Sequence, residues 1–202
     1  IDLLREITKL QVTRARYANP LTLLPGNVPI QQQLQRLFAA HADFVVCYFD
    51  LDHFKPFNDF FGFSRGDMVL KFVAELLTTT LTGPDDFVGH VGGDDFVAIL
   101  HGADWEAAIR SILHQFDDCI GGFYNSHIGC VITATDREGR LRDYDKMTLS
   151  VGAVVVSGEA EESAAAHLST AAATAKYHAK AMPGSSLYSL DAATHPVFAP
   201  AP

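Results

Sequence analysis

In several stretches of the chain the apolar residues recur every three or four positions, which is the spacing of an amphipathic helix. Ile1, Leu4 and Ile7 repeat in this way at the start. We expect this first helix to end before Asn19-Pro20, because the residue ahead of a proline avoids the helical region. Further helices are predicted at 29–40, from about residue 66 onward, at 105–116 and at 160–182.

Other stretches are continuous apolar runs of strand length. Residues 44–49 are rich in β-branched and aromatic side chains, which is typical of a buried central strand. Two more strands are predicted at 87–91 and 96–100. Residues 127–156 indicate a strand, a turn at 137–139 and a second strand, and Leu187-Tyr188 fits an edge strand.

The segment Gly92-Gly93-Asp94-Asp95 lies between two of these predicted strands and is typical of a tight hairpin. A hairpin makes its two strands antiparallel, which excludes a purely parallel, doubly wound sheet. We therefore expect a single α+β domain of ferredoxin-like character, with a central, mostly antiparallel sheet flanked by helices.

Composition narrows the classes of partner. A chain of 202 residues with 48% hydrophobic and 19% charged residues can bury a full core. The net charge of −9 argues against nucleic acid and against direct contact with an anionic membrane, although a divalent cation still allows a phosphorylated nucleotide to bind. Cys47, Cys119 and Cys130 have no C-x-x-C spacing, so we expect reduced cysteines and a cytoplasmic location.

Three carboxylates are expected to meet at one end of the sheet. Asp50 follows the central strand, and Asp94 and Asp95 lie in the hairpin turn. If the hairpin pairs with the central strand, these groups repel one another, and Mg²⁺ is the usual remedy. The alternative is that the turn is only a solvated hairpin, and these residues alone leave both interpretations open.

A longer pattern surrounds these carboxylates and resembles the signature of GGDEF domains, the diguanylate cyclase family. The segment D-L-D-H-F-K-P-F-N-D from Asp50 matches its D-x-D-x-F-K-x-x-N-D motif, and G-G-D-D-F from Gly92 is a variant of the namesake motif. In chain order the matching segments are 19–25, 50–59, 62–67, 92–96, 149–152 and 179–180. The resemblance implies a nucleotidyl-cyclase palm over 19–190, a connecting helix at 1–18 and a flexible tail at 191–202.

The resemblance implies a metal site built from this motif. Asp50, the backbone carbonyl of Leu51 and Asp94 would hold Mg²⁺ or Mn²⁺, two ions per GTP site. Asp95 would complete the metal site or help to deprotonate the attacking 3′-hydroxyl group. His53 would orient or pack rather than bind metal.

The resemblance also implies how the nucleotide is bound. Asn58 and Asp67 would bind the guanine edge, since a carboxylate accepts from N1–H and N2–H while an amide supplies a donor. Without the resemblance, Asn58 fits a turn residue and Asp67 an acid at a helix N-terminus. The phosphates would be steadied by Lys55 and Lys180, and approached by the backbone at Gly92 and Gly93.

The family joins two GTP molecules into cyclic di-GMP and releases pyrophosphate. The resemblance implies that two chains form a two-fold homodimer, each holding one GTP, so that each 3′-hydroxyl attacks the other nucleotide. The alternative is a catalytically weak GTP-binding regulatory module that controls an attached domain such as an EAL phosphodiesterase.

The sequence departs from the family pattern at several positions. His90 stands where arginine is usual and Asn19 where aspartate is usual; these positions pair in the family, so we expect a neutral contact between them. Ser185 stands where a phosphate-facing arginine is expected. Gly83 replaces the arginine of the R-x-x-D inhibitory motif, of which only Asp86 remains, so feedback by cyclic di-GMP at that site is not expected.

Residues 121–144 form a longer segment than expected at this point. Together with Pro25-Gly26-Asn27 and the turn at 136–139, this segment resembles GGDEF domains at the C-terminus of proteins that carry EAL and CBS domains. The resemblance implies an upstream sensory or EAL/CBS partner that is connected through residues 1–18.

Overall fold

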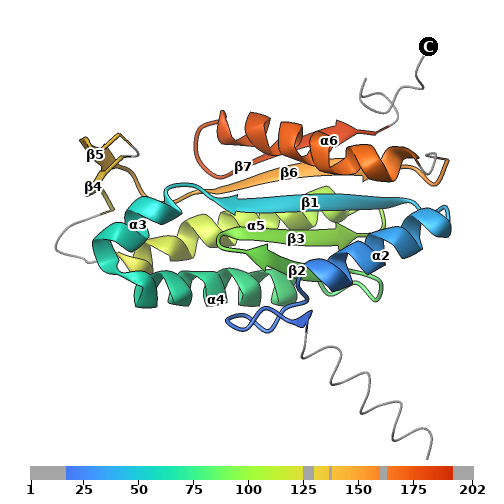
Figure 1. Ribbon diagram of the computed structural model, residues 1–202, viewed down its shortest axis with the longest axis horizontal. Helices are drawn as coiled ribbons and strands as arrows, with labels where there is room; N and C mark the ends of the chain where they lie inside the picture. Colours follow the sequence, from blue (N-terminus) through green and yellow to red (C-terminus); the bar gives the residue numbers. More distant parts are fainter. Residues whose placement is uncertain (1–16, 125–129, 137, 160–162, 193–202) are drawn as a thin grey trace, which may run out of the picture.

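The fold is an α+β sandwich, as expected from the sequence (Figure 1). A computed structural model describes residues 17–124, 130–136, 138–159 and 163–192. Most of the helix predicted at 1–18 and almost all of the tail predicted at 191–202 lie outside these residues. Within the described chain, none of the helices combines the length and the apolar character needed to cross a bilayer.

The central sheet has five strands in the order β2-β3-β1-β6-β7. Strand β1 (Phe44–Leu51) lies in the middle and pairs antiparallel with both β3 (Asp95–Leu100) and β6 (Leu149–Val156). Strand β2 (Phe87–Gly92) continues the hairpin, and β7 (Ser186–Asp191) adds a parallel edge strand beside β6. The expected central strand, hairpin and edge strand are therefore confirmed.

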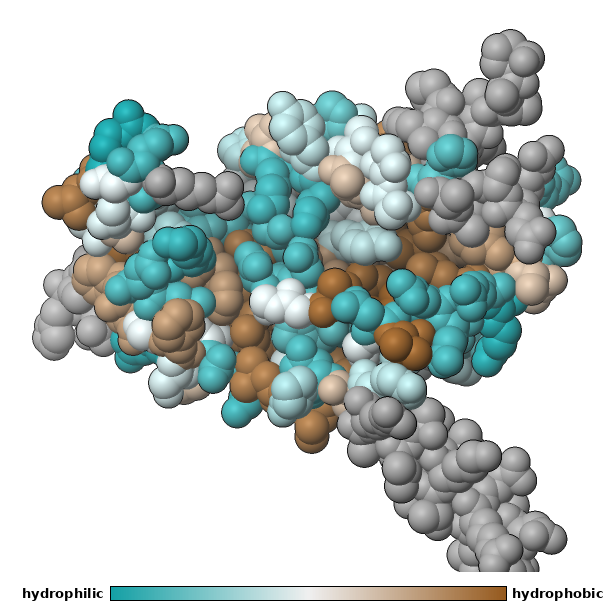
Figure 2. Space-filling model, viewed as in Figure 1, coloured by the Kyte–Doolittle hydropathy of each residue, from teal (hydrophilic) through white to brown (hydrophobic). Residues whose placement is uncertain are grey.

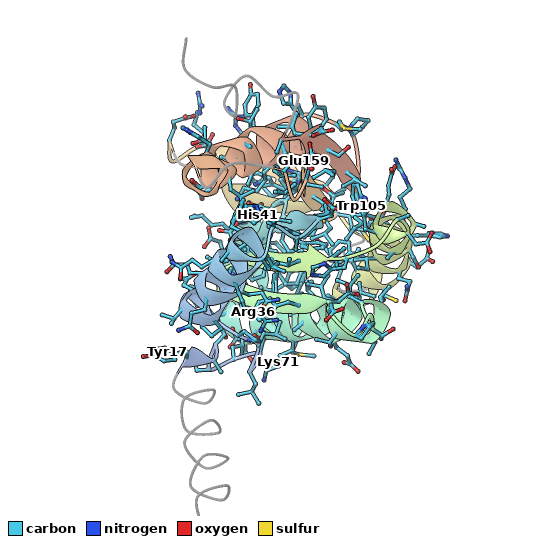
Figure 3. The ribbon with its side chains drawn as sticks, turned by 90° about the vertical axis from the view of Figure 1, so that its right-hand side faces the viewer. Tyr17, Arg36, His41, Lys71, Trp105 and Glu159 are labelled. Carbon is cyan, nitrogen blue, oxygen red and sulfur yellow. The ribbon has the colours of Figure 1, made fainter. Side chains whose placement is uncertain are left out.

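The two faces of the sheet are covered by different helices. Val45, Cys47 and Phe49 of β1 pack into a core with α4 (Phe63–Thr80) and α5 (Trp105–Cys119). Phe44 and Val46, which alternate with them, pack on the other face, under α2 (Asn27–Ala39) and α6 (Ser163–Lys180). Figure 3 shows these layers end-on, with Arg36 of α2 and Trp105 of α5 on opposite sides.

Three parts of the fold differ from the sequence prediction. The segment after β1 forms a separate helix, α3 (Phe54–Phe61), which was not predicted. Its Pro56 lies in the first turn, where the missing N–H of a proline is not needed. Gly62, at φ 85°, divides α3 from α4, which begins at Phe63 rather than near Gly66. Helix α3 follows β1, the strand that carries Asp50, and α4 follows α3 after Gly62.

The third difference lies between α5 and β6. Here η1 (Ile120–Phe123) is followed by a separate two-stranded sheet of β4 (Ile132–Thr135) and β5 (Leu141–Tyr144). The predicted strand and turn at 137–139 correspond to the β4–β5 hairpin. The second predicted strand is divided into β5 and β6, and of these only β6 joins the central sheet. The β4–β5 hairpin instead packs beside α3 at one end of the molecule (Figure 1).

Helix α6 lies unusually close to the sheet at Gly152 of β6. A Cβ atom added at Gly152 would lie 2.8 Å from the Cα of Lys176 and closer still to its amide nitrogen. A glycine at this strand position is thus required by the approach of another backbone rather than by a turn. This contact sets the height of α6 above the sheet.

We expect Gly152→Ala to destabilise the domain by about 1–3 kcal/mol, because a methyl group here forces α6 away from β6. Urea unfolding would measure the change. Gly121→Ala is the matched control, since a Cβ at Gly121 meets no atom within 4 Å. Equal stabilities for the two variants would show that α6 can move without cost.

Candidate active site

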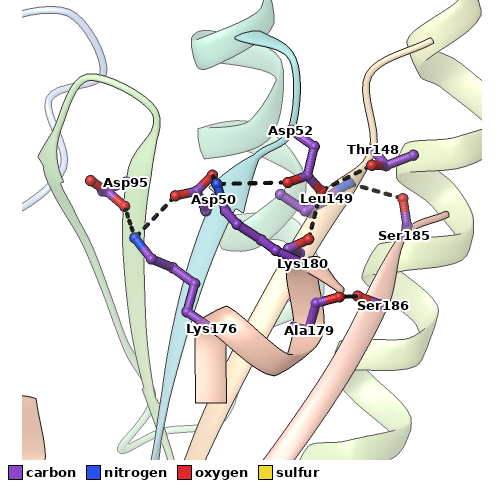
Figure 4. A network of polar contacts seen from close by, with 11 residues as sticks. Asp50, Asp52, Asp95, Thr148, Leu149, Lys176, Ala179, Lys180, Ser185 and Ser186 are labelled. Carbon is purple, nitrogen blue, oxygen red and sulfur yellow. Dashed lines mark hydrogen bonds and ion pairs between the residues drawn. The ribbon is translucent and has the colours of Figure 1, made fainter. Parts of the chain in front are cut away.

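Strand register brings two of the predicted carboxylates together. In the antiparallel pairing of β1 with β3, Asp50 lies directly opposite Asp95. Side chains alternate along a strand, so Asp50 shares the face of Phe44 and Val46, which is the face covered by α6. Both carboxylates therefore point toward the C-terminal half of α6 (Figure 4).

Two lysines of α6 meet these carboxylates. The Lys176 ammonium lies 2.8 Å from Asp95 Oδ1 and 3.0 Å from Asp50 Oδ2, so it bridges the two strands. Lys180, one helical turn further, pairs with Asp50 Oδ1 and lies 3.7 Å from Asp52 Oδ1. Lys180 was predicted to bind phosphate, whereas Lys176 was not identified from the sequence. The signal that could have indicated Lys176 is its spacing of four residues from Lys180, which places both lysines on one face of the helix.

Asp52 is oriented by the neighbouring strand. Its Oδ2 accepts hydrogen bonds from Ser150 Oγ at 2.6 Å and from Thr148 Oγ1 at 2.9 Å. With one oxygen held by two hydroxyl groups, only Oδ1 is left to face Lys180. Asp52 therefore adds fixed negative charge next to Asp50.

Asp94 lies in the turn between β2 and β3, where Gly92 and Gly93 have φ values of 145° and 59° that side chains rarely adopt. Burial raises the pKa of Asp94, and the nearby carboxylate of Asp50 raises it further. The negative charge of the Asp94 carboxylate is only partly offset by positive groups of the protein. It is suited to a cation that arrives with a ligand.

A hollow of about 250 Å³ opens beside Asp94. Its walls come from the end of β1, from α3, from α6 and from the β4–β5 hairpin, and they include Leu51, Lys55, Asp94, Asp136, Tyr144 and Lys180. The ring of His53 packs against that of Tyr144, with centroids 5.5 Å apart. Figure 2 shows hydrophilic residues gathered between the hairpin and α6 on this face.

The two residues predicted to bind guanine lie around the junction of α3 and α4. The Asn58 side chain lies against Gly66, where a Cβ atom would collide with its Oδ1. That buried oxygen has no hydrogen-bond partner among the described residues. Asp67, the next residue after Gly66, is exposed, so a ligand with N–H donors can reach this region.

Lys55 is not aimed at the carboxylates of the site. Its ammonium pairs with Asp59 at 2.6 Å on the surface of α3, and its side chain is 68% exposed. An exposed pair of this kind contributes little to stability and is easily exchanged. Lys55 nevertheless lines the hollow beside Asp94, so it can turn toward an anion there.

The prediction of a neutral contact between Asn19 and His90 is wrong, because each side chain has a different partner. Asn19 Oδ1 accepts from the backbone N–H groups of Leu21 and Thr22, closing its own turn. His90 lies 2.9 Å from Thr22 Oγ1 through Nδ1 and 3.0 Å from the Gly93 carbonyl through Nε2. Because a carbonyl only accepts, Nε2 carries the proton and Nδ1 accepts from the Thr22 hydroxyl.

His90 thus ties the entry turn to the acidic hairpin. It is buried and stacks on Phe96, with ring centroids 4.1 Å apart. Burial lowers the pKa of His90, against the opposing effects of the Gly93 carbonyl and Asp95. The neutral imidazole is therefore the form that the folded protein accommodates.

Ser185 and Asp86 belong to two motifs that have each lost an arginine, and both have structural roles. Ser185 Oγ donates to Asp117 at 2.6 Å and accepts from the amide of Leu149 at 3.0 Å, which joins α5 to β6. Asp86 accepts from the amide of Gly83 and from that of His101. Both side chains therefore form hydrogen bonds within the protein. The arginine that the family pattern places in each of these two motifs is absent from this sequence.

The donor set fits a magnesium ion bound together with a nucleotide. Among the described residues no group of three histidine, cysteine or acidic side chains is arranged to hold a metal alone. Asp50 Oδ1 is buried and, within the same residues, contacts Lys180 as an ion pair without hydrogen-bond geometry. Mg²⁺ commonly takes only one or two carboxylates and completes its shell with phosphate and water.

Known proteins resemble this chain in sequence. The family model "Diguanylate cyclase, GGDEF domain" matches residues 17–185. The diguanylate cyclase DgcP of Pseudomonas aeruginosa is 37% identical over 101 residues, which are 48% of this chain and 15% of that protein. The DgcP of Escherichia coli K12 is 33% identical over 135 residues, 65% of this chain and 38% of its own length.

Solved structures share the fold. The coiled coil and GGDEF domain of DgcB from Caulobacter crescentus, in complex with c-di-GMP, superposes with a TM-score of 0.67 at 20% identity and covers 94% of this chain and 93% of that one. The S helix-GGDEF-EAL portion of Vibrio cholerae LapD, bound to c-di-GMP, gives a TM-score of 0.70 at 17% identity, over 98% and 42% of the two chains.

The lowered pKa of His90 predicts a pH-dependent contribution to stability. Below the ordinary value of 6.5 the unfolded chain takes up a proton that the folded chain resists, so stability falls as the pH falls through this range. At pH 8 we expect His90→Gln to be less stable than the wild type by about 1–2 kcal/mol, from weakened hydrogen bonds. That difference should shrink toward pH 5.5.

Urea unfolding of both proteins between pH 8 and pH 5.5 measures the difference, and titrating groups shared by the two proteins cancel. A difference that is independent of pH would show that His90 titrates equally in both states.

Proposed function

Because the chain belongs to the GGDEF domain family of diguanylate cyclases, we propose that it condenses two molecules of GTP into cyclic di-GMP and releases pyrophosphate. The observation that carries the proposal is the meeting of Asp50, Asp94 and Asp95 at the end of β1, where Asp94 and Lys180 line an open hollow. This arrangement suits a triphosphate with its metal ion. The chain spans less than half the length of each curated relative named above, so the activity of the whole protein is part of the proposal.

We propose that Asp50, the carbonyl of Leu51 and Asp94 hold Mg²⁺ or Mn²⁺ against the phosphates. When bound, the ion offsets charge on the triphosphate and favours the ionised 3′-hydroxyl group. The raised pKa of Asp94 supports this role, because a cation relieves the repulsion that Asp94 experiences from Asp50.

The nucleotide is held at both ends by residues of this chain. Asp67 accepts from N1–H and N2–H of guanine, and Asn58, whose buried Oδ1 is unpartnered among the described residues, contacts the same edge. At the other end Lys55 and Lys180 exchange their present carboxylate partners for phosphate oxygens. The backbone at Gly92 and Gly93 approaches the phosphates without side chains in the way.

Two chains related by a two-fold axis complete the reaction. The 3′-oxygen of one GTP attacks the α-phosphorus of the other, and the bond from that phosphorus to the bridging oxygen of pyrophosphate breaks. The hydroxyl proton passes to Asp95 or to solvent. The 3′-oxygen of the second GTP attacks the α-phosphorus of the first in the same way, which closes the ring. Two phosphodiester bonds form and two pyrophosphates leave.

The proposed reaction also implies a cellular location and an upstream domain that controls it. GTP is a cytoplasmic metabolite, so we place the activity in the cytoplasm. A sensory or EAL/CBS domain connected through residues 1–18 in a longer protein would control the pairing of the two chains. Dimerisation is the step most open to such control, because neither chain can close the ring alone.

Incubation with GTP and Mg²⁺ at several protein concentrations tests the activity, with nucleotides separated by chromatography. We expect cyclic di-GMP to form at a rate that rises more than proportionally with protein concentration, since the active species is a dimer. Asp94→Ala should reduce the rate by at least 100-fold through loss of a metal ligand.

Asp85→Ala, at an exposed position outside the site, is the control for losing one carboxylate. Tight GTP binding without any product would identify a regulatory module instead. Failure to bind GTP at all would refute both functions.

Guanine recognition is tested with inosine triphosphate, which lacks the N2 amino group. We expect Asp67→Asn to lower GTP affinity about 10–100-fold, the contribution of hydrogen bonds to a charged acceptor, and to reduce the preference for GTP over inosine triphosphate. Calorimetric titration of wild type, Asp67→Asn and the control Asp85→Asn measures this. An unchanged preference in Asp67→Asn would remove Asp67 from the base site.

A further inference from the structure

Lys176 occupies the space between two carboxylates that the family pattern assigns to metal chemistry. Its ammonium contacts Asp50 Oδ2 and Asp95 Oδ1 at 3.0 and 2.8 Å, and its side chain is only 27% exposed. The three groups come from three different elements, α6, β1 and β3. The bridge is therefore part of the tertiary structure and not a local surface pair.

The backbone beneath Lys176 is fixed against the sheet. Gly152 of β6 leaves no Cβ between the strand and the amide of Lys176, and Gly152 is opposite Tyr48 in the pairing of β6 with β1. Two residues beyond Tyr48 along β1 lies Asp50. The side chain of Lys176 thus starts within one strand repeat of Asp50, and its stem runs along the sheet to reach the carboxylates.

The adjacent acids of the turn face different hollows. Asp94 shares its hollow with Leu51 and Lys180, and this is the hollow proposed for the triphosphate. Asp95 and Lys176 line a second hollow of about 210 Å³, together with Tyr48, Val91 and Ala172. Asp94 therefore faces an open hollow that can admit a metal ion, whereas the position between Asp50 and Asp95 already contains the ammonium group of Lys176.

Electrostatic repulsion supports the same division. A second divalent ion between Asp50 and Asp95 would lie within a few ångströms of the Lys176 ammonium group, which contacts both carboxylates. Like charges at that distance repel strongly.

We propose that the Lys176 ammonium takes the place of one of the two divalent cations, so that this site binds GTP with a single Mg²⁺ on the Asp94 side. The inference rests on the proposed function. Lys176 acts as a positioning residue: it holds Asp50 and Asp95 together before any nucleotide arrives, and it leaves Asp50 Oδ1 to pair with Lys180, which lines the open hollow.

Counting bound metal tests the inference without turnover. Equilibrium dialysis with Mn²⁺ and 3′-deoxyguanosine triphosphate, which lacks the attacking hydroxyl, gives the ratio of bound Mn²⁺ to bound nucleotide. We expect a ratio of one for the wild type. Lys176→Met keeps the length of the stem and removes the charge, so it should bind a second Mn²⁺ at least tenfold more tightly than the wild type.

Two control variants separate charge from other effects. Lys176→Arg, which retains the cation, should keep the ratio at one. Lys71→Met removes a lysine from the exposed surface of α4, at the far end of the molecule from α6 in Figure 3, and should also leave the ratio at one. A ratio of two in either control would show that the second ion does not depend on Lys176.

The outcomes distinguish this inference from the proposed function. If the nucleotide binds and the wild type holds two Mn²⁺, the function stands and the role of Lys176 is refuted. If Lys176→Met folds and still holds one Mn²⁺, the role is likewise refuted. If the nucleotide does not bind at all, the proposed function fails and the inference fails with it. Should Lys176→Met not fold, the wild-type ratio still decides between one cation and two.

Discussion

The structure depends on the pairing of Asp50 with Asp95 across β1 and β3, and on the lysines that make this pairing tolerable. Two carboxylates directly opposite each other in an antiparallel sheet repel, more strongly where one side chain is only 9% exposed. Helix α6 supplies Lys176 and Lys180, which are four residues apart and so lie on the same face of the helix. The close approach of α6 to β6 at Gly152 is what brings these ammonium groups within reach.

Much of the remaining polar structure fixes the surroundings of this pair. Thr148 and Ser150 orient Asp52, Ser185 joins β6 to α5, and His90 links the acidic turn to the entry segment. The compensation is incomplete at Asp94, whose pKa is raised by burial and by Asp50. A site that keeps an incompletely compensated carboxylate is less stable than it could be.

Sequence patterns were reliable wherever local spacing controlled the structure. The apolar run of β1, the glycine-rich hairpin and the helical spacing of α2 and α5 each predicted the element found. They were unreliable in two segments: the helix α3 after β1 was not predicted, and the strand predicted after the turn at 137–139 is divided into β5 and β6. The partner of His90 also required the fold, since Thr22 and Asn19 are close in sequence and only one of them faces the imidazole.

By itself the sequence determined the class of fold, the position of the acidic hairpin and the residues of the family motif, because these follow from short-range periodicity and spacing. Only the tertiary structure decided which side chains share a surface. Lys176 lies 81 residues from Asp95 along the chain, and no local pattern connects them. Their contact follows from strand register, from side-chain alternation and from the height of α6 above β6, and these are properties of the assembled sheet.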